Sequence, residues 1–194
     1  DGTDQIQDRT PLRESKEVVG HNVFFTYLFT GAADIYLETG EPALLAALQR
    51  LWRDLTERKI NVNGGVSPMG VGLSNGHFVN EAVGPAYFLP NAASYNETCG
   101  QIGFFMWSHR LLCAAGGDGA AFADWMEWTI HNGVMSGMGL DGQSWYYRNP
   151  LRREAGYRAA GHNDMSQRES PGAARICCPS NMIRTIAELH TYFY

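Results

Sequence analysis

The chain has 194 residues, the length of one domain or of part of a larger one. Hydrophobic residues make up 44%, aromatic residues 12% and charged residues only 18%, which excludes an intrinsically disordered chain. A net charge of −5 without a basic tract argues against nucleic acid or an anionic membrane as the main partner. No apolar run reaches the roughly 18 residues that cross a bilayer, and the polar start is not a signal peptide. Unpaired cysteines and the absence of a visible export signal favour a cytoplasmic location.

The chain predicts helices that alternate between apolar and amphipathic. Residues 14–39 are apolar nearly all round, which predicts a helix buried on all sides, and Gly40 is expected to end it. Residues 42–59 carry one apolar stripe and one charged face, which predicts an outer helix. The same alternation predicts three more helices: 102–112 (buried), 118–135 (amphipathic) and one that begins after Pro179.

Alternating buried and amphipathic helices fit concentric layers, an α/α toroid. We therefore predict an all-α fold that forms part of a helical barrel.

Two segments are not helical. Residues 61–90 are rich in glycine and proline and predict a long irregular loop, a feature that is usually functional. Residues 140–147 predict a small β-hairpin on an Asp-Gly turn.

Three cysteines and one carboxylate form a candidate zinc site. Zinc takes four thiolate, imidazole or carboxylate ligands in a tetrahedron, and thiolates favour zinc over calcium or magnesium. Residues two apart on a regular helix point about 200° from each other, so Glu97 and Cys99 can share an ion only where the backbone is irregular or just enters a helix. Asn96 is a competent N-cap that would place both in the first turn. The candidate ligands are Glu97, Cys99, Cys177 and Cys178.

The same residues also have purely structural interpretations. Free cysteine often packs in a core, and we expect Cys113, on the buried helix, to do so. The sequence has no Cys-x-x-Cys spacing, and Glu97 can simply sit favourably at a helix N-terminus. Glu81 can be a solvated loop carboxylate. The residues alone leave both interpretations open.

Several motifs follow one another in a recognisable order: Asn63-Gly64-Gly65, then 87–91, then Tyr95-Asn96-Glu97-Thr98-Cys99, then 135–142, then Cys177-Cys178-Pro179-Ser180-Asn181. Together they resemble glycoside hydrolase family 127, the β-L-arabinofuranosidases, over nearly the whole chain. The resemblance implies that residues 1–194 are the C-terminal half of a helical catalytic toroid, the second half of an (α/α)6 barrel. N-terminal helices and a following β-sandwich would be absent. Gly100 stands where alanine is common in the family, a mild departure.

The resemblance implies a retaining glycosidase that releases β-L-arabinofuranose or a related sugar, with Zn²⁺ as its cofactor. Cys177 would be the nucleophile and would share the zinc with Glu97, Cys99 and Cys178. Glu81 falls at the position of the family's acid/base. A thiol with a pKa near 8.5 is mostly protonated at neutral pH, and zinc deprotonates a bound thiol.

The same resemblance implies that His21 and Tyr147 contact the sugar. His77 is a further candidate on its position alone, four residues before Glu81 in the Gly-rich loop. The expected partner is a glycan that contains arabinofuranoside, with no nucleic acid and no membrane; a homodimer stays open.

Two alternatives remain at this point. The same chemistry could act on another plant cell-wall sugar, including an acidic one, with its carboxylate paired by Arg148, Arg152 or Arg158, which could equally be solvated. The chain could also be a non-catalytic remnant in which zinc only stabilises the fold, because metal binding alone does not establish catalysis.

Overall fold

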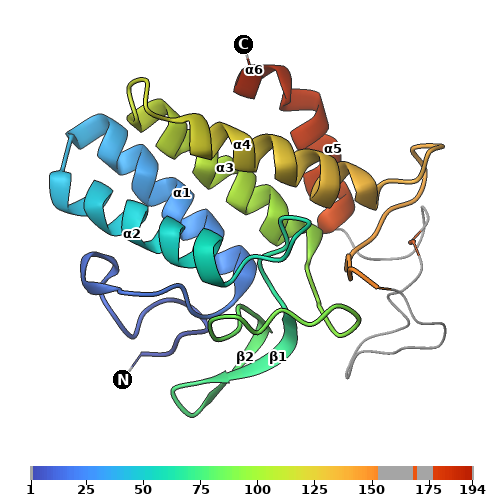
Figure 1. Ribbon diagram of the computed structural model, residues 1–194, viewed down its shortest axis with the longest axis horizontal. Coiled ribbons are helices and arrows are strands. Elements are labelled where there is room, and N and C mark those ends of the chain that lie inside the picture. Colours follow the sequence, from blue (N-terminus) through green and yellow to red (C-terminus); the bar gives the residue numbers. More distant parts are fainter. Residues whose placement is uncertain (1, 153–167, 170–176, 194) are drawn as a thin grey trace.

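The structure is a computed structural model that describes residues 2–152, 168–169 and 177–193. This part of the chain is mostly helical and contains a two-stranded sheet (Figure 1). Its main elements are α1 (Asn22–Thr39), α2 (Pro42–Arg58), β1 (Met69–Ser74), β2 (His77–Ala82), α3 (Thr98–Ala114), α4 (Ala120–Thr129), α5 (Cys178–Glu188) and α6 (His190–Phe193). Short 3-10 turns at Leu12–Glu14 and Met135–Gly137 and a π-helical turn at Ile130–Val134 complete the helical segments. A mostly helical fold is confirmed, whereas the closure into half a toroid stays a prediction.

α1 and α2 form a helical hairpin, as their patterns predict. Gly40 ends α1 in the left-handed conformation (φ 66°), and its N–H donates to the Tyr36 carbonyl at 2.7 Å. Pro42 occupies the first turn of α2, where its missing N–H costs nothing. None of the helices in the described ranges is long and apolar enough to cross a membrane.

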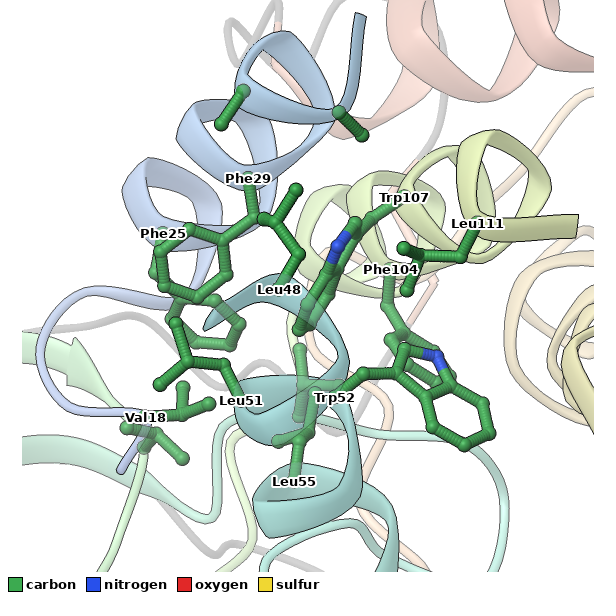
Figure 2. Packing of buried hydrophobic residues seen from close by; sticks show 14 of the residues in the cluster. Val18, Phe25, Phe29, Leu48, Leu51, Trp52, Leu55, Phe104, Trp107 and Leu111 are labelled. Atoms are coloured by element: carbon green, nitrogen blue, oxygen red, sulfur yellow. The ribbon is translucent and has the colours of Figure 1, made fainter. Parts of the chain in front are cut away.

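The core lies where α3 passes between the α1–α2 hairpin and α4 (Figures 1 and 2). Phe104 and Trp107 of α3 are fully buried and meet edge to face, 6.3 Å between ring centroids. Phe29 of α1 packs on Trp107, and Trp52 of α2 packs near Phe104. Aromatic rings of this size dominate core energetics, so this cluster fixes how α1 and α3 approach each other.

The prediction that residues 14–39 form one helix buried on all sides is wrong. The α-helix begins only at Asn22, and several large apolar side chains of α1 are exposed, among them Phe24 (43%), Leu28 (44%) and Ile35 (55%). In the described part of the chain α1 packs chiefly against α2 and α3. An apolar sequence shows which helix can be buried, but the burial itself depends on which neighbours are present.

The structure contains a hairpin that the sequence pattern did not predict. β1 and β2 pair antiparallel within the segment that was expected to be irregular, and Asn75 (φ 50°) and Gly76 (φ 78°) form their turn. At the position of the predicted hairpin, 140–147, the chain reverses at Asp141-Gly142: Met138 and Trp145 form an antiparallel bridge, and the Gly139 N–H donates to the Ser144 carbonyl at 2.7 Å. The Gly-rich loop therefore contains the hairpin whose second strand carries Glu81.

Candidate metal and catalytic centre

Three helix N-termini and the end of a strand meet at one place (Figure 1). His21 caps α1 through its side chain, and Glu97 and Cys177 occupy the N-cap positions of α3 and α5. Glu81 lies one residue before the end of β2. The prediction that Asn96 caps α3 is wrong by one residue, because Asn96 adopts φ 44° outside the helix. Helix N-termini carry partial positive charge, which favours carboxylates and thiolates at this place.

The four predicted zinc ligands converge. One ligand atom from each of Glu97, Cys99, Cys177 and Cys178 lies within 4.8 Å of the other three. The Cys99 sulfur lies 3.2 Å from that of Cys177 and 3.4 Å from that of Cys178. Glu97 Oε1 lies 3.6 Å from the Cys177 sulfur and 3.5 Å from the Cys178 sulfur. Residues about 80 positions apart thus form one cluster.

This donor set fits zinc. Bonds of 2.3 Å to sulfur and about 2.0 Å to oxygen in a tetrahedron separate a sulfur from an oxygen by about 3.5 Å and two sulfurs by about 3.8 Å. The observed sulfur–oxygen distances, 3.6 and 3.5 Å, match, and the sulfur–sulfur distances, 3.2 and 3.4 Å, are slightly shorter. Glu97, Cys99 and Cys178 are buried and Cys177 is exposed. The set therefore combines one exposed cysteine with three buried residues.

The pKa values of the acidic groups in the cluster shift in different directions. Hydrogen bonds from the thiols of Cys178 and Cys99 lower the pKa of Cys177 to about 3. A hydrogen bond with Cys177 raises the pKa of Cys99, and burial raises the pKa of Cys178. Burial, followed by the neighbouring Glu81 carboxylate, raises the pKa of Glu97 well above its usual range. In the protein alone, the thiolate is therefore most stable on the accessible cysteine.

Glu81 is held beside this cluster by two donors. His21 Nε2 lies 3.1 Å from Oε2, and the Tyr95 hydroxyl donates to Oε1 at 2.7 Å. His21 Nδ1 accepts from the Val23 N–H at 3.1 Å, so Nε2 carries the proton toward Glu81. Burial opposes ionisation of Glu81, but hydrogen bonds from His21, Glu97 and Tyr95 outweigh it and lower its pKa to about 2. Glu81 adopts φ 49°, a conformation uncommon outside glycine.

The structure places the three predicted sugar contacts differently. His21 lies in the centre, stacked on Phe24 at 4.2 Å between ring centroids. Tyr147 also lies there: its carbonyl accepts from the Thr98 N–H at 3.1 Å, and its side chain is partly buried. His77 is exposed at the other end of β2, roughly 13 Å along the strand from Glu81. The structure thus does not bring His77 to the centre.

Sequence reasoning missed two supporting residues and misjudged two others. Tyr95 and Asn22 both hydrogen-bond to Glu81, and no periodicity or spacing marks them. Cys113 is exposed instead of buried in the core, because it lies on the outer side of α3 near its end. Arg148 is 1% exposed and donates to the carbonyls of residues 92 and 94, both at 2.9 Å.

Known proteins resemble this chain over most of its length. The profile of the β-L-arabinofuranosidase GH127 catalytic domain matches residues 1–191. A non-reducing end β-L-arabinofuranosidase of Bifidobacterium longum subsp. longum is 31% identical over 192 residues, 97% of this chain and 27% of that protein.

Solved structures also resemble this chain over nearly its whole length. A structure titled glycoside hydrolase superposes with a TM-score of 0.90 and 35% identity over 99% of this chain and 32% of its own. A GH127 β-L-arabinofuranosidase of Geobacillus stearothermophilus T6 has a TM-score of 0.84 and 32% identity over 98% of this chain and 28% of its own. The chain thus spans less than a third of the length of these relatives. It belongs to the GH127 β-L-arabinofuranosidase catalytic-domain family.

Proposed function

We propose that this chain carries the reaction centre of a retaining glycoside hydrolase that releases β-L-arabinofuranose or a related sugar. The observation that carries the proposal is the convergence of one accessible cysteine, three buried donors and a second carboxylate at one place. Membership of the family supports glycoside hydrolysis as the reaction class. A retaining reaction needs a nucleophile and a separate acid/base, and Cys177 and Glu81 supply the two groups.

Glu97, Cys99, Cys177 and Cys178 would hold Zn²⁺. When bound, zinc keeps its thiol ligands deprotonated at neutral pH. Cys177 fits the role of nucleophile because its side chain is the accessible one among the three cysteines. The buried Cys99 and Cys178 then serve as anchors that hold the site.

In the first step the Cys177 thiolate forms a bond to the anomeric carbon while the bond to the leaving oxygen breaks. Glu81 donates its proton to that oxygen, so the leaving group departs as a neutral alcohol. In the second step the Glu81 carboxylate takes a proton from water, and the resulting hydroxide displaces the sulfur. Both groups then return to their starting states.

Glu81 must hold a proton when the glycosidic bond breaks. Burial is the largest influence on its pKa and acts upward, against the hydrogen bonds that lower it. A sugar that excludes water from the centre increases this burial and so favours the protonated form. His21 and Tyr95 orient the carboxyl group through one oxygen each.

A rival within the same chemistry is an acidic sugar as substrate. Arg148 does not suit it, because its guanidinium is buried and donates to main-chain carbonyls. Arg152 is exposed at the surface, and Arg158 lies outside the described residues. Within the described residues, Arg148 is therefore not available to a substrate carboxylate.

The rival from another class is a structural metal site without catalysis, which the cluster of donors alone also permits.

The domain assignment, a cytoplasmic location and a homodimer are further predictions from the sequence. For the domain assignment, the exposed apolar side chains of α1 and the span of the longer relatives support additional helices beside this chain.

Substitution of the nucleophile separates the two functions. In the complete protein, Cys177→Ser should abolish hydrolysis of an aryl β-L-arabinofuranoside, while Cys113→Ser, an exposed cysteine outside the cluster, should keep full activity. Circular dichroism should show both variants folded. Full activity of Cys177→Ser removes this cysteine as the nucleophile, and stoichiometric zinc without turnover of any furanoside by the parent protein would favour the structural role.

A further inference from the structure

The side-chain amide of Asn22 bridges the two carboxylate residues of the centre. Its Nδ2 donates to the Glu81 main-chain carbonyl at 2.8 Å and to Glu97 Oε2 at 3.2 Å. Asn22 is fully buried at the first position of α1. Both neighbours are acceptors, so the NH₂ group must face them and both of its protons are used. We propose that Asn22 is a positioning residue that fixes Glu97 as a metal ligand and sets its place relative to Glu81.

The two oxygens of Glu97 face different partners. Oε1 lies 3.6 and 3.5 Å from the sulfurs of Cys177 and Cys178, whereas Oε2 accepts from Asn22. A ligand carboxylate with one oxygen held by a buried donor presents the other in a fixed direction. Partners that orient ligands in this way typically change metal affinity or activity 10–100-fold when removed. This inference rests on the metal site proposed above.

The second bond of Asn22 holds the backbone of Glu81. A residue other than glycine at φ 49° persists only where its surroundings hold it. The Glu81 carbonyl is bound by Asn22, and the adjacent Ala82 forms a bridge with His21. Asn22 therefore ties the acid/base residue and the buried carboxylate to the same point of α1.

Gly100 provides the space that Asn22 occupies. A Cβ on Gly100 would lie 1.9 Å from Asn22 Oδ1, the far end of a side chain that can rotate. We therefore expect alanine at this position to turn the amide away and break both bonds. One turn later, a Cβ on Gly103 would lie 2.2 Å from Thr26 Oγ1 and 2.7 Å from Thr26 Cβ. Alanine at Gly103 therefore crowds the same pair of helices at a threonine whose hydroxyl donates only to main-chain carbonyls of α1, and it serves as a steric control.

Cobalt binding tests the proposal independently of activity. Co²⁺ replaces zinc in thiolate sites and absorbs visible light when bound there, so the absorbance reports how much cobalt the protein holds. Competition with a chelator then gives the dissociation constant. We expect Asn22→Ala and Gly100→Ala each to weaken Co²⁺ binding about tenfold or more. Gly103→Ala should stay within about threefold of the parent protein, at a comparable change in melting temperature.

The double variant adds a second criterion. If alanine at Gly100 acts through Asn22, it costs no further cobalt affinity in the Asn22→Ala background, because the amide is already gone. Asn22→Ala alone decides the matter should Gly100→Ala not fold. Parent-like cobalt affinity of Asn22→Ala, or an equal loss in Gly103→Ala, overturns the positioning role while the metal site stands. Failure of the parent protein to bind cobalt would overturn both the positioning role of Asn22 and the metal site.

Discussion

The Cys177 sulfur lies 3.6 Å from Glu97 Oε1, although 80 positions separate the two residues. The start of α5 supplies the sulfur and the start of α3 supplies the oxygen. Two helix N-termini packed against each other thus form the contact, and Cys99 and Cys178 complete it. A single bound cation would neutralise donors that otherwise compete for protons in a buried place.

Zinc should raise the melting temperature of the protein. A ligand that binds only the folded state at a hundred times its dissociation constant contributes about 2.7 kcal/mol, or about 5–10 °C in a domain of this size. Differential scanning fluorimetry with zinc and with a chelator measures the shift. We expect Cys178→Ser to lose it and Cys113→Ser to keep it, since only Cys178 belongs to the cluster. An equal shift in both variants would place the zinc elsewhere.

Tyr95→Phe should reduce turnover more than stability. The change removes the hydroxyl that donates to Glu81 Oε1 at 2.7 Å and leaves the buried ring in place. We expect kcat to fall about tenfold or more, because the acid/base group loses one of its two orienting donors, with a cost near 1 kcal/mol in unfolding free energy. Steady-state kinetics and urea unfolding measure the two effects. Unchanged kcat would show that the Tyr95 hydroxyl does not orient Glu81.

Arg148→Ala should destabilise the fold. Arg148 is buried, donates to the Ser94 and Ala92 carbonyls, and pairs through its backbone with Glu97. The substitution leaves these two carbonyl acceptors without their donors, which should lower the unfolding free energy by about 2–4 kcal/mol. Arg13→Ala, which breaks an exposed ion pair with Glu41 at 2.5 Å, should leave the unfolding midpoint almost unchanged. Comparable midpoints for the two variants would contradict a structural role for Arg148.

The bounds of α2 and the end of α1 followed well from the sequence, because periodicity and end signals are local. The predicted helix at 42–59 is found at Pro42–Arg58, and Gly40 ends α1 as expected. The burial of α1 did not follow, since it depends on distant neighbours. The hairpin at β1 and β2 had a usable signal, the Asn75-Gly76 pair, which is typical of two-residue turns.

The cysteine cluster was predicted from residue types together with the family resemblance, and the structure brings those residues together. Asn22 and Tyr95 could not be predicted, because both act through contacts that only the fold brings together. His77 illustrates the opposite error. Closeness in sequence to Glu81 suggested closeness in space, but an extended strand separates residues four apart by roughly 13 Å.

Covalent labelling tests the central claim most directly. A β-L-arabinofuranose analogue with a cysteine-reactive group at the anomeric position should add once to the complete protein, and peptide mass mapping should locate it on Cys177. Excess arabinose should slow the labelling, because both compete for the same site. A label on the exposed Cys113, or full hydrolytic activity in protein whose Cys177 is quantitatively modified, would contradict the account.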